Sequence, residues 1–305
     1  MDQLLIEAAR DAGATLLESF QPKKPIWSEG KLVGVLGDCR GKQFEVRANL
    51  IVGADGRASW LNSVVRPAEY DIHPARTAFY YAFWRNVRHP EPLAYAYWQL
   101  SNQRCVVLIC PADNDLTVVC LVLRKADVEG LPINQSKTYM MRVTAHPVLA
   151  DWLKGSSTIT RIWAFASTRM WRRIPFGPGW VLTGDAGMHV DPIGGRGIEH
   201  ALIQSELLSK AIVKSFDSEA TFDETFSAFW RTRDKVTNYD YYQIAKVAAL
   251  EPLSGEEVTG LKRLRDDPAF LETWLDARSQ YEDFAHKSVI ADNKENAQHL
   301  YKGAI

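Results

Sequence analysis

The sequence predicts a mixed α/β fold, and three patterns support this fold class. Two short apolar segments each end at a turn of glycine and aspartate, Gly53-Ala54-Asp55-Gly56 and Gly184-Asp185-Ala186. Between these motifs, apolar residues from 77 to 168 recur largely at every second position, as they do in strands. After residue 216 the chain is charged and has the spacing of helices.

Composition limits the classes of function. The 305 residues are 46% hydrophobic, which suffices for a buried core, and the formal net charge of -1 does not indicate nucleic acid or an anionic membrane as a partner. A small-molecule substrate is therefore expected. The four cysteines lack Cys-x-x-Cys spacing, the apolar runs at 105–110 and 116–123 are too short to cross a membrane, and no targeting segment is visible. These features predict a cytoplasmic protein without disulfides or a membrane span.

The N-terminal segment predicts one short helix and a hairpin. Apolar residues from Leu4 to Ala12 recur at helical spacing, and Gly13 follows where a left-handed cap belongs. Strand-like residues at 32–36 and 44–52 flank turn signals. We expect the last strand of this hairpin to run into Gly53.

The middle of the chain predicts a sheet with one helix. The alternating positions of the sheet are Tyr81, Phe83, Tyr95, Tyr97, Val106, Leu108, Thr117, Val119 and Leu121. Residues 136–153 have helical spacing, with Pro147 bending or ending a turn. A short strand at 180–183 and a helix after Gly197 follow. One face of that helix comprises Ile198, Leu202, Leu208 and Ile212.

The first motif predicts a carboxylate at the end of a strand. An apolar strand that ends in Gly-Ala-Asp-Gly turns sharply and presents Asp55 at its carboxyl edge, where open α/β folds bind ligands. A simple Asp-Gly hairpin turn explains the same four residues equally well. The flanking apolar residues 50–52 favour the binding interpretation.

The second motif is more specific. It combines a strand, Gly184-Asp185, Pro192 and a glycine turn that opens a long helix, so a carboxylate and a helix N-terminus occur in one short stretch. Asp185 is suited to accept a hydrogen bond from a ribose hydroxyl, and amides near Gly195 are suited to negative charge. The alternative is a helix that simply begins with glycine after a proline loop.

These residues resemble a known family. Residues 179–208, GWVLTGDAGMHVDPIGGRGIEHALIQSELL, resemble the GD motif and following helix of class A FAD-dependent monooxygenases, the superfamily of para-hydroxybenzoate hydroxylase. Residues 49–61 resemble its DG motif. Geranylgeranyl reductases and flavin halogenases are related families, although Met170-Trp171-Arg172-Arg173-Ile174-Pro175 meets the halogenase signature only in part. The resemblance covers nearly the whole chain.

The resemblance implies a Rossmann-like FAD/NAD(P)-binding domain with an inserted sheet. It implies FAD as cofactor and NAD(P)H as reductant. The expected regions are 1–70 with the DG motif, 71–175 as a β-sheet substrate domain, 176–215 with the GD motif, and 216–305 as a helical region. The implied cofactor-binding residues are Gly53, Asp55, Gly56, Gly184, Asp185, Pro192, Gly194, Gly195, Gly197 and Ile198.

One feature of the family is missing from this sequence. Members open with a Gly-x-Gly-x-x-Gly turn that binds the FAD diphosphate, and the sequence contains no such pattern. The FAD-binding domain is therefore expected to be incomplete. The expected activity is that of a FAD-dependent monooxygenase or oxidoreductase acting on a small apolar or aromatic substrate with NAD(P)H and O2. The alternatives are a truncated, non-catalytic remnant with weak or no FAD binding, and a double-bond reductase similar to geranylgeranyl reductase.

Other candidate residues have ordinary explanations. His189 is a weak candidate for a general acid or base, and packing of the loop is the simpler role. Arg169, Arg172, Arg173 and Arg196 form a basic group that we interpret as a solvated face. Aromatic pairs such as Tyr80-Tyr81 and Phe83-Trp84 line a substrate pocket or belong to the core. His286 and His299 are expected at the surface.

Overall fold

A computed structural model describes residues 1–88, 95–99, 105–128, 135–145, 147–217, 221–252, 254–274 and 276. His286, His299 and most of the last thirty residues lie outside this part of the chain. The chain forms two compact units: unit 1 is Met1–Ala68 with Arg173–Gly187, and unit 2 is Glu69–Arg172 with Met188–Ile305. Helices and strands occur in both, which confirms the predicted mixed α/β class. The division into four regions stays a prediction.

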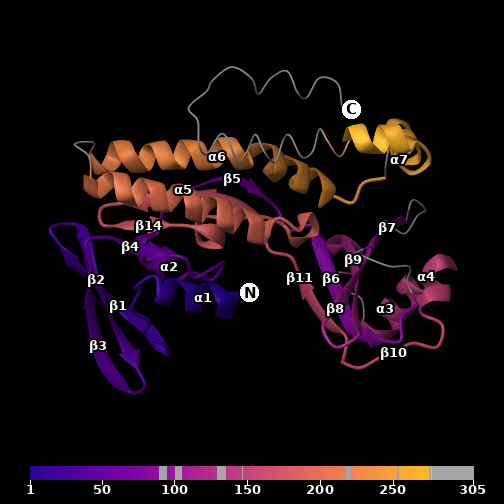
Figure 1. Cartoon of the computed structure of the whole chain (residues 1–305), viewed down its shortest axis with the longest axis horizontal. Helices are drawn as coiled ribbons and strands as arrows, with labels where there is room; N and C mark the ends of the chain where they lie inside the picture. Colours follow the sequence, from indigo (N-terminus) through magenta and orange to yellow (C-terminus); the bar gives the residue numbers. More distant parts are fainter. Residues whose placement is uncertain are drawn as a thin grey trace. The chain divides into compact units, whose positions relative to one another are not determined.

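Unit 1 consists of two small sheets and two helices (Figure 1). Its elements are α1 (Asp2–Asp11), β1 (Phe20–Ser28), β2 (Lys31–Cys39), β3 (Lys42–Arg47), β4 (Ile51–Gly53), α2 (Trp60–Val65), β13 (Phe176–Gly177) and β14 (Trp180–Leu182). Strands β1, β2 and β3 form an antiparallel sheet, and the second sheet has the order β13-β14-β4. The core of unit 1 comprises Leu32, Leu61, Trp180, Leu182 and Ala186.

The predicted N-terminal helix and its cap are present. Gly13 has a φ of 97°, and its amide donates to the Arg10 carbonyl at 2.9 Å. The predicted hairpin is correct for β2 and β3, but its last strand does not continue to Gly53. Strand β3 ends at Arg47, and β4 belongs to the other sheet, where the Ile51 amide donates to Gly179 at 2.9 Å.

Strand β1 was not predicted from the sequence. Pro22 and Pro25 interrupt its alternation, and the pairing with β2 shifts register near Pro22. Proline is tolerated here because β1 is an edge strand, where the missing N–H faces away from the sheet. The two prolines therefore break the alternating pattern by which strands are recognised in a sequence, although the edge position allows the strand to form.

Unit 2 is built on an antiparallel sheet of order β10-β6-β9-β8-β7, with β11 also paired to β6. Its strands are β5 (Glu69–His73), β6 (Thr77–Arg85), β7 (Tyr95–Gln99), β8 (Cys105–Ala112), β9 (Leu116–Arg124), β10 (Ser157–Thr158), β11 (Trp163–Ala166) and β15 (Met188–His189), and β12 (Met170–Arg173) reaches the boundary. Its helices are α3 (Gln135–Val143), α4 (Pro147–Trp152), α5 (Gly197–Asp217), α6 (Phe222–Val247) and α7 (Gly255–Asp266). Strands β15, β12 and β5 form a second, three-stranded sheet.

Helices cover one face of the large sheet of unit 2. Tyr139 and Leu149, from α3 and α4, pack with Ala82, Val107 and Leu121 in a hydrophobic core. Helix α3 ends before Pro147, which begins α4, so the predicted interruption of this helix is confirmed. None of the helices in the described ranges combines the length and apolarity needed to cross a membrane.

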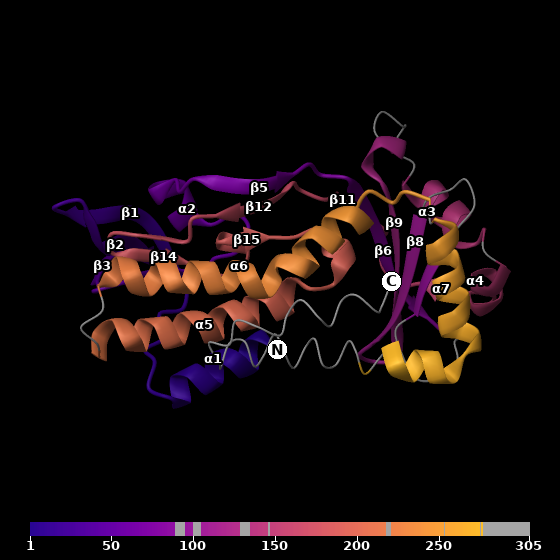
Figure 2. The ribbon, with the colours of Figure 1, turned by 90° about the horizontal axis from the view of Figure 1, so that it is seen from above.

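Helices α5 and α6 run side by side (Figures 1 and 2). Helix α5 begins at Gly197, as predicted, but only part of the predicted apolar face is buried. Of its four residues, Leu208 is buried, whereas Ile198 and Leu202 are 63% and 50% exposed. The buried stripe includes His200 and Gln204, because polar residues occupy positions that a search for apolar spacing passes over.

Candidate functional site

The two sequence motifs lie at one edge of the second sheet of unit 1. Strands β4 and β14 are parallel neighbours, with Leu182 opposite Gly53, and the Thr183 amide donates to the Gly53 carbonyl at 2.9 Å. Parallel strands end at the same edge, so the turns that follow both strands lie together. Two motifs that are far apart in the sequence are thereby adjacent in the fold.

Gly53 serves the packing between β4 and α2. A Cβ atom at this position would lie 2.7 Å from Leu182 Cδ2 and 2.8 Å from Leu61 Cδ2, which is closer than side chains approach. The glycine therefore lets two core leucines close over the end of the strand. This role was not apparent from the sequence, which indicated only a turn.

Asp55 caps helix α2. Its Oδ2 atom accepts from the amides of Trp60 at 2.7 Å and Leu61 at 3.3 Å, while Ser59 accepts from Asn62 at 2.9 Å. Both side chains thus satisfy amides that have no partner within the helix. Gly56 adopts a φ of 75° in open space. The first motif is a structured turn whose aspartate binds backbone in this structure.

Asp185 lies half-buried in a single 3-10 turn, Gly184–Ala186, directly after β14. A buried guanidinium supports this turn: Arg173 donates to the Ala186 carbonyl at 2.7 Å, and its backbone amide donates to Gly187 at 3.0 Å. The turn closes through the Gly187 amide, which donates to Gly184 at 2.9 Å. The position of Asp185 is therefore set by side-chain and backbone bonds on both sides.

The remaining predicted site residues belong to unit 2, and they are Pro192, Gly194, Gly195, Gly197 and Ile198. They follow a buried aspartate that was not predicted. Asp191 is 2% exposed, accepts from the Thr77 hydroxyl at 2.7 Å and caps the 3-10 turn Pro192–Gly194 through the Ile193 amide at 3.0 Å. Gly194 packs on α6, since a Cβ there would lie 2.4 Å from Ile244 Cγ1. Asp191 and Thr77 were missed in the sequence, where they carry no motif.

A left-handed glycine leads into helix α5. Gly195 has a φ of 66°, and the helix begins at Gly197. Arg196 forms ion pairs with Glu199 and, at 3.4 Å, with Asp240 of α6. The Nε2 atom of buried His200 also lies 3.4 Å from Asp240. The first turn of α5, with its N-terminal amides, is thus tied to α6 by charged and polar groups.

His189 is buried and packed. Its Nε2 atom lies 2.9 Å from the Thr168 hydroxyl, and its ring centroid lies 4.6 Å from that of Trp171. These contacts support the packing role for His189 over the role of a general acid or base.

The interpretation of the arginine group as a solvated face is wrong for two of its members. Arg172 is 2% exposed and donates to Asp71 at 3.2 Å, while its guanidinium lies 4.3 Å from the Tyr241 ring centroid. Arg173 is also buried, within unit 1. Arg169 retains an exposed ion pair with Glu69 at 2.7 Å. The sequence did not show which arginines are buried, because the groups that bind Arg172 and Arg173 lie on other elements of the fold.

The residues of the motif edge fit the nucleoside end of FAD. The Thr183 hydroxyl is buried beside Gly184 and has no hydrogen-bond partner within the described residues, so the end of β14 retains an unused polar group. Asp185 follows two positions later as an acceptor. In the described ranges, no group of three or more His, Cys, Asp or Glu residues is arranged to hold a metal ion.

Comparison with known proteins identifies the family. A family model described as an FAD binding domain matches residues 1–227. The fold is similar to that of the flavin-dependent brominase Bmp2, with a TM-score of 0.69 and 18% identity over 94% of this chain and 68% of that chain.

Two further solved structures share this fold. The myxobacterial chondrochloren halogenase CndH has a TM-score of 0.69 and 16% identity over 95% of this chain and 72% of that chain. The anhydrotetracycline hydroxylase OxyS from Streptomyces rimosus has a TM-score of 0.65 and 15% identity over 96% of this chain and 56% of that chain. The chain belongs to this family of FAD binding domains, in agreement with the resemblance of its two motifs to those of class A FAD-dependent monooxygenases.

Proposed function

We propose that the chain acts as a FAD-dependent monooxygenase or related oxidoreductase on a small apolar or aromatic substrate, with NAD(P)H and O2. The observation that carries this proposal is the parallel pairing of β4 with β14, which brings the turns of Asp55 and Asp185 to one strand edge. Ligands of open α/β sheets bind at this edge. FAD supplies the redox chemistry when it is bound, and the protein orients it and excludes water.

The protein's own residues would divide the work of holding FAD. Asp185 would accept a hydrogen bond from the ribose, in a turn supported by Arg173. The backbone amides between Gly195 and Ile198 would favour negative charge, because they lie at the start of a 21-residue helix whose N-terminus is electropositive. Gly53 and Gly194 would act through packing, and Asp55 would hold the first turn in shape.

The substrate would lie on the aromatic face of β6. Residues Phe79, Tyr81 and Phe83 alternate with Tyr80, Ala82 and Trp84, which pack toward α3 and α4. On the opposite side, the ring of Phe79 stacks on that of Phe165 with centroids 4.9 Å apart, and Phe165 remains 41% exposed. A flat apolar molecule is the chemical class that such a surface favours.

A remnant with weak FAD affinity is the second candidate. Two observations favour it: the sequence contains no Gly-x-Gly-x-x-Gly turn, and the Asp55 carboxylate already binds the amides of α2. Without the glycine-rich turn, the diphosphate lacks the amides and helix dipole that usually hold it.

A flavin-reconstitution experiment separates the two candidates. The full chain is purified, its fold is checked by circular dichroism, FAD is added, and unbound flavin is removed by gel filtration. Near-stoichiometric flavin absorbance, followed by oxygen consumption that depends on NADH or NADPH, supports the enzyme. A folded chain that stays colourless supports the remnant. A double-bond reductase would instead consume NAD(P)H without oxygen when an alkene substrate is present.

A further inference from the structure

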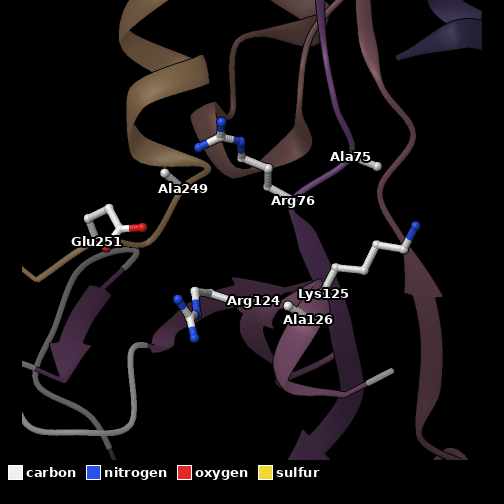
Figure 3. Close-up of a pocket in the computed structure, with 7 residues that line it drawn as sticks. All are labelled: Ala75, Arg76, Arg124, Lys125, Ala126, Ala249 and Glu251. Atoms are coloured by element: carbon white, nitrogen blue, oxygen red, sulfur yellow. The ribbon is translucent and has the colours of Figure 1, made fainter. Parts of the chain in front are cut away.

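A pocket in unit 2 is lined by residues that no motif includes. It has a volume of 280 Å³ and lies where β6 begins, β9 ends and the chain leaves α6 (Figure 3). The lining residues are Ala75, Arg76, Arg124, Lys125, Ala126, Ala249 and Glu251. This volume suits a small ligand rather than a flavin, since drug-sized ligands occupy about 300–1,000 Å³.

The backbone around this pocket is held firmly. The Lys125 amide donates to the Arg76 carbonyl at 2.7 Å, and Thr77 pairs with Arg124 in the sheet. On the other wall, Leu250 adopts a φ of 48° and is 3% exposed. A left-handed backbone is unfavourable at a non-glycine residue, and burial of the leucine side chain against the sheet offsets this strain. Leu250 thereby holds its neighbours Ala249 and Glu251 in place.

The pocket is positively charged. Three cationic side chains line it against the single carboxylate of Glu251. Arg124 is braced by Asp127, which accepts from its Nε at 3.0 Å and its Nη2 at 2.6 Å. Arg76 is exposed, and its side chain has no hydrogen-bond or ion-pair partner among the residues that the structure describes. Figure 3 shows Arg76 and Arg124 extending from adjacent ends of the neighbouring strands β6 and β9, with Ala249 and Glu251 contributed by the segment that follows α6.

Small residues leave the space that these cations surround. Three of the seven lining residues are alanines, contributed by the segment before β6, the 3-10 turn Lys125–Asp127 after β9, and the segment after α6. The negative end of the α6 dipole offers an alternative reason for nearby cations. A dipole explains attraction to the helix end, but it does not explain an open space bounded by alanines on three separate segments.

We propose that this pocket binds a small oxyanion, the phosphate or carboxylate group of a small ligand, between Arg76 and the braced guanidinium of Arg124. Guanidinium groups bind phosphate and carboxylate through two parallel hydrogen bonds, and Asp127 holds Arg124 in one orientation. The proposal does not depend on flavin binding, because the lining residues belong to other segments than the two motifs.

Calorimetric titration of the full chain without FAD tests the proposal. Inorganic phosphate and succinate are titrated separately at constant ionic strength. The expected result is saturable binding of at least one of them, weakened at least tenfold by Arg76→Gln, since one charge-assisted hydrogen bond is worth about 1.5–3 kcal/mol and 1.4 kcal/mol is a factor of ten. The control Arg85→Gln, at the exposed far end of β6, is expected to bind as the unmodified chain does.

A second variant tests the space rather than the charge. Ala126→Leu keeps all three cations but fills the pocket, so binding is expected to be lost while circular dichroism shows a folded chain. Binding of neither anion, equal effects of Arg76→Gln and Arg85→Gln, or unchanged binding in Ala126→Leu would each overturn the proposal. The anion that binds identifies the class of ligand. Flavin binding is measured in a separate experiment, so the two proposals fail independently.

Discussion

Strands β4 and β14 are parallel neighbours, and each is followed by a turn with glycine and aspartate, yet the two aspartates have different surroundings. Asp55 is exposed, and its Oδ2 atom binds two amides of α2. Asp185 is half-buried in a turn supported from behind by the buried Arg173. The comparison teaches that a strand-end Gly-Asp pattern specifies a turn, while the tertiary structure decides the surroundings of the carboxylate. Three predictions test the two sides of this comparison, and a fourth concerns Tyr70 of unit 2.

The largest expected effect is at Gly53, on the β4 side. Gly53→Val places methyl groups where Leu61 and Leu182 already meet, and overpacking of this kind destabilises a core by about 1–3 kcal/mol. Gly56→Ala serves as the control, with a loss of about 1 kcal/mol from its positive φ alone. Urea denaturation measures both. Equal losses for the two variants would show that Gly53 is an ordinary turn glycine.

The next effect concerns Asp185. If Asp185 accepts from the FAD ribose, Asp185→Ala weakens FAD affinity by roughly tenfold to a hundredfold, as expected from about 1.5–3 kcal/mol for a hydrogen bond to a charged group. Fluorescence titration with FAD measures the dissociation constant. Asp38→Ala is the matched control, because Asp38 caps a turn of unit 1 by accepting from the Gly41 amide at 2.9 Å. Unchanged affinity in Asp185→Ala would falsify the assignment.

Asp55→Ala tests the other side of the comparison. Loss of its bonds to α2 is expected to lower the free energy of unfolding by about 1 kcal/mol, the usual effect of removing a helix cap. FAD affinity should fall less than in Asp185→Ala. A larger loss of FAD affinity than of stability would instead assign Asp55 to the cofactor, as the family resemblance implied.

The smallest expected effect is a pH dependence of the free energy of unfolding. It arises from Tyr70 in unit 2 and does not involve the two motifs. Burial raises the pKa of Tyr70 to about 12, although Arg233 opposes the shift, and the neutral phenol donates to Asp234 at 2.5 Å. The pKa of Tyr70 in the folded protein lies above its ordinary value of 10. The contribution of the neutral Tyr70 phenol to stability is therefore complete below pH 10 and is lost as the pH rises toward 12.

Tyr70→Phe should therefore unfold with a weaker pH dependence than the unmodified chain between pH 10 and 12. Thermal unfolding across this range measures the difference. Identical pH profiles for the two proteins would contradict the role of Tyr70.

Several elements were predictable because their signals are local. The cap at Gly13, the strand at β14 and the start of α5 follow from glycine conformation and apolar runs within a few residues. Strand β1 was not predictable, because its two prolines disrupt the pattern while its edge position tolerates them. The buried face of α5 was also misjudged, because His200 and Gln204 are buried polar residues.

The candidate site shows the same division. The sequence indicated Gly53, Asp55, Gly184 and Asp185 as site residues, since glycine and aspartate at a strand end carry a recognisable chemistry. It did not indicate Asp191 or Thr77, whose bond joins residues far apart in the chain. From the sequence, Arg173 was also placed at the surface, because charged residues are mostly exposed unless they are paired, and the partner of Arg173 was not apparent.

By itself, the sequence determined the mixed α/β class, the two motifs and the membership of a flavin-binding family. Only the tertiary structure decided that the motifs share an edge, that Gly53 is a packing residue, that Asp55 caps α2, and that Arg76 and Arg124 line a pocket. The physical reason is that motifs record local backbone and side-chain chemistry. Strand pairing, burial and pockets arise from contacts between segments that are distant in the chain, and these contacts cannot be read from local sequence patterns.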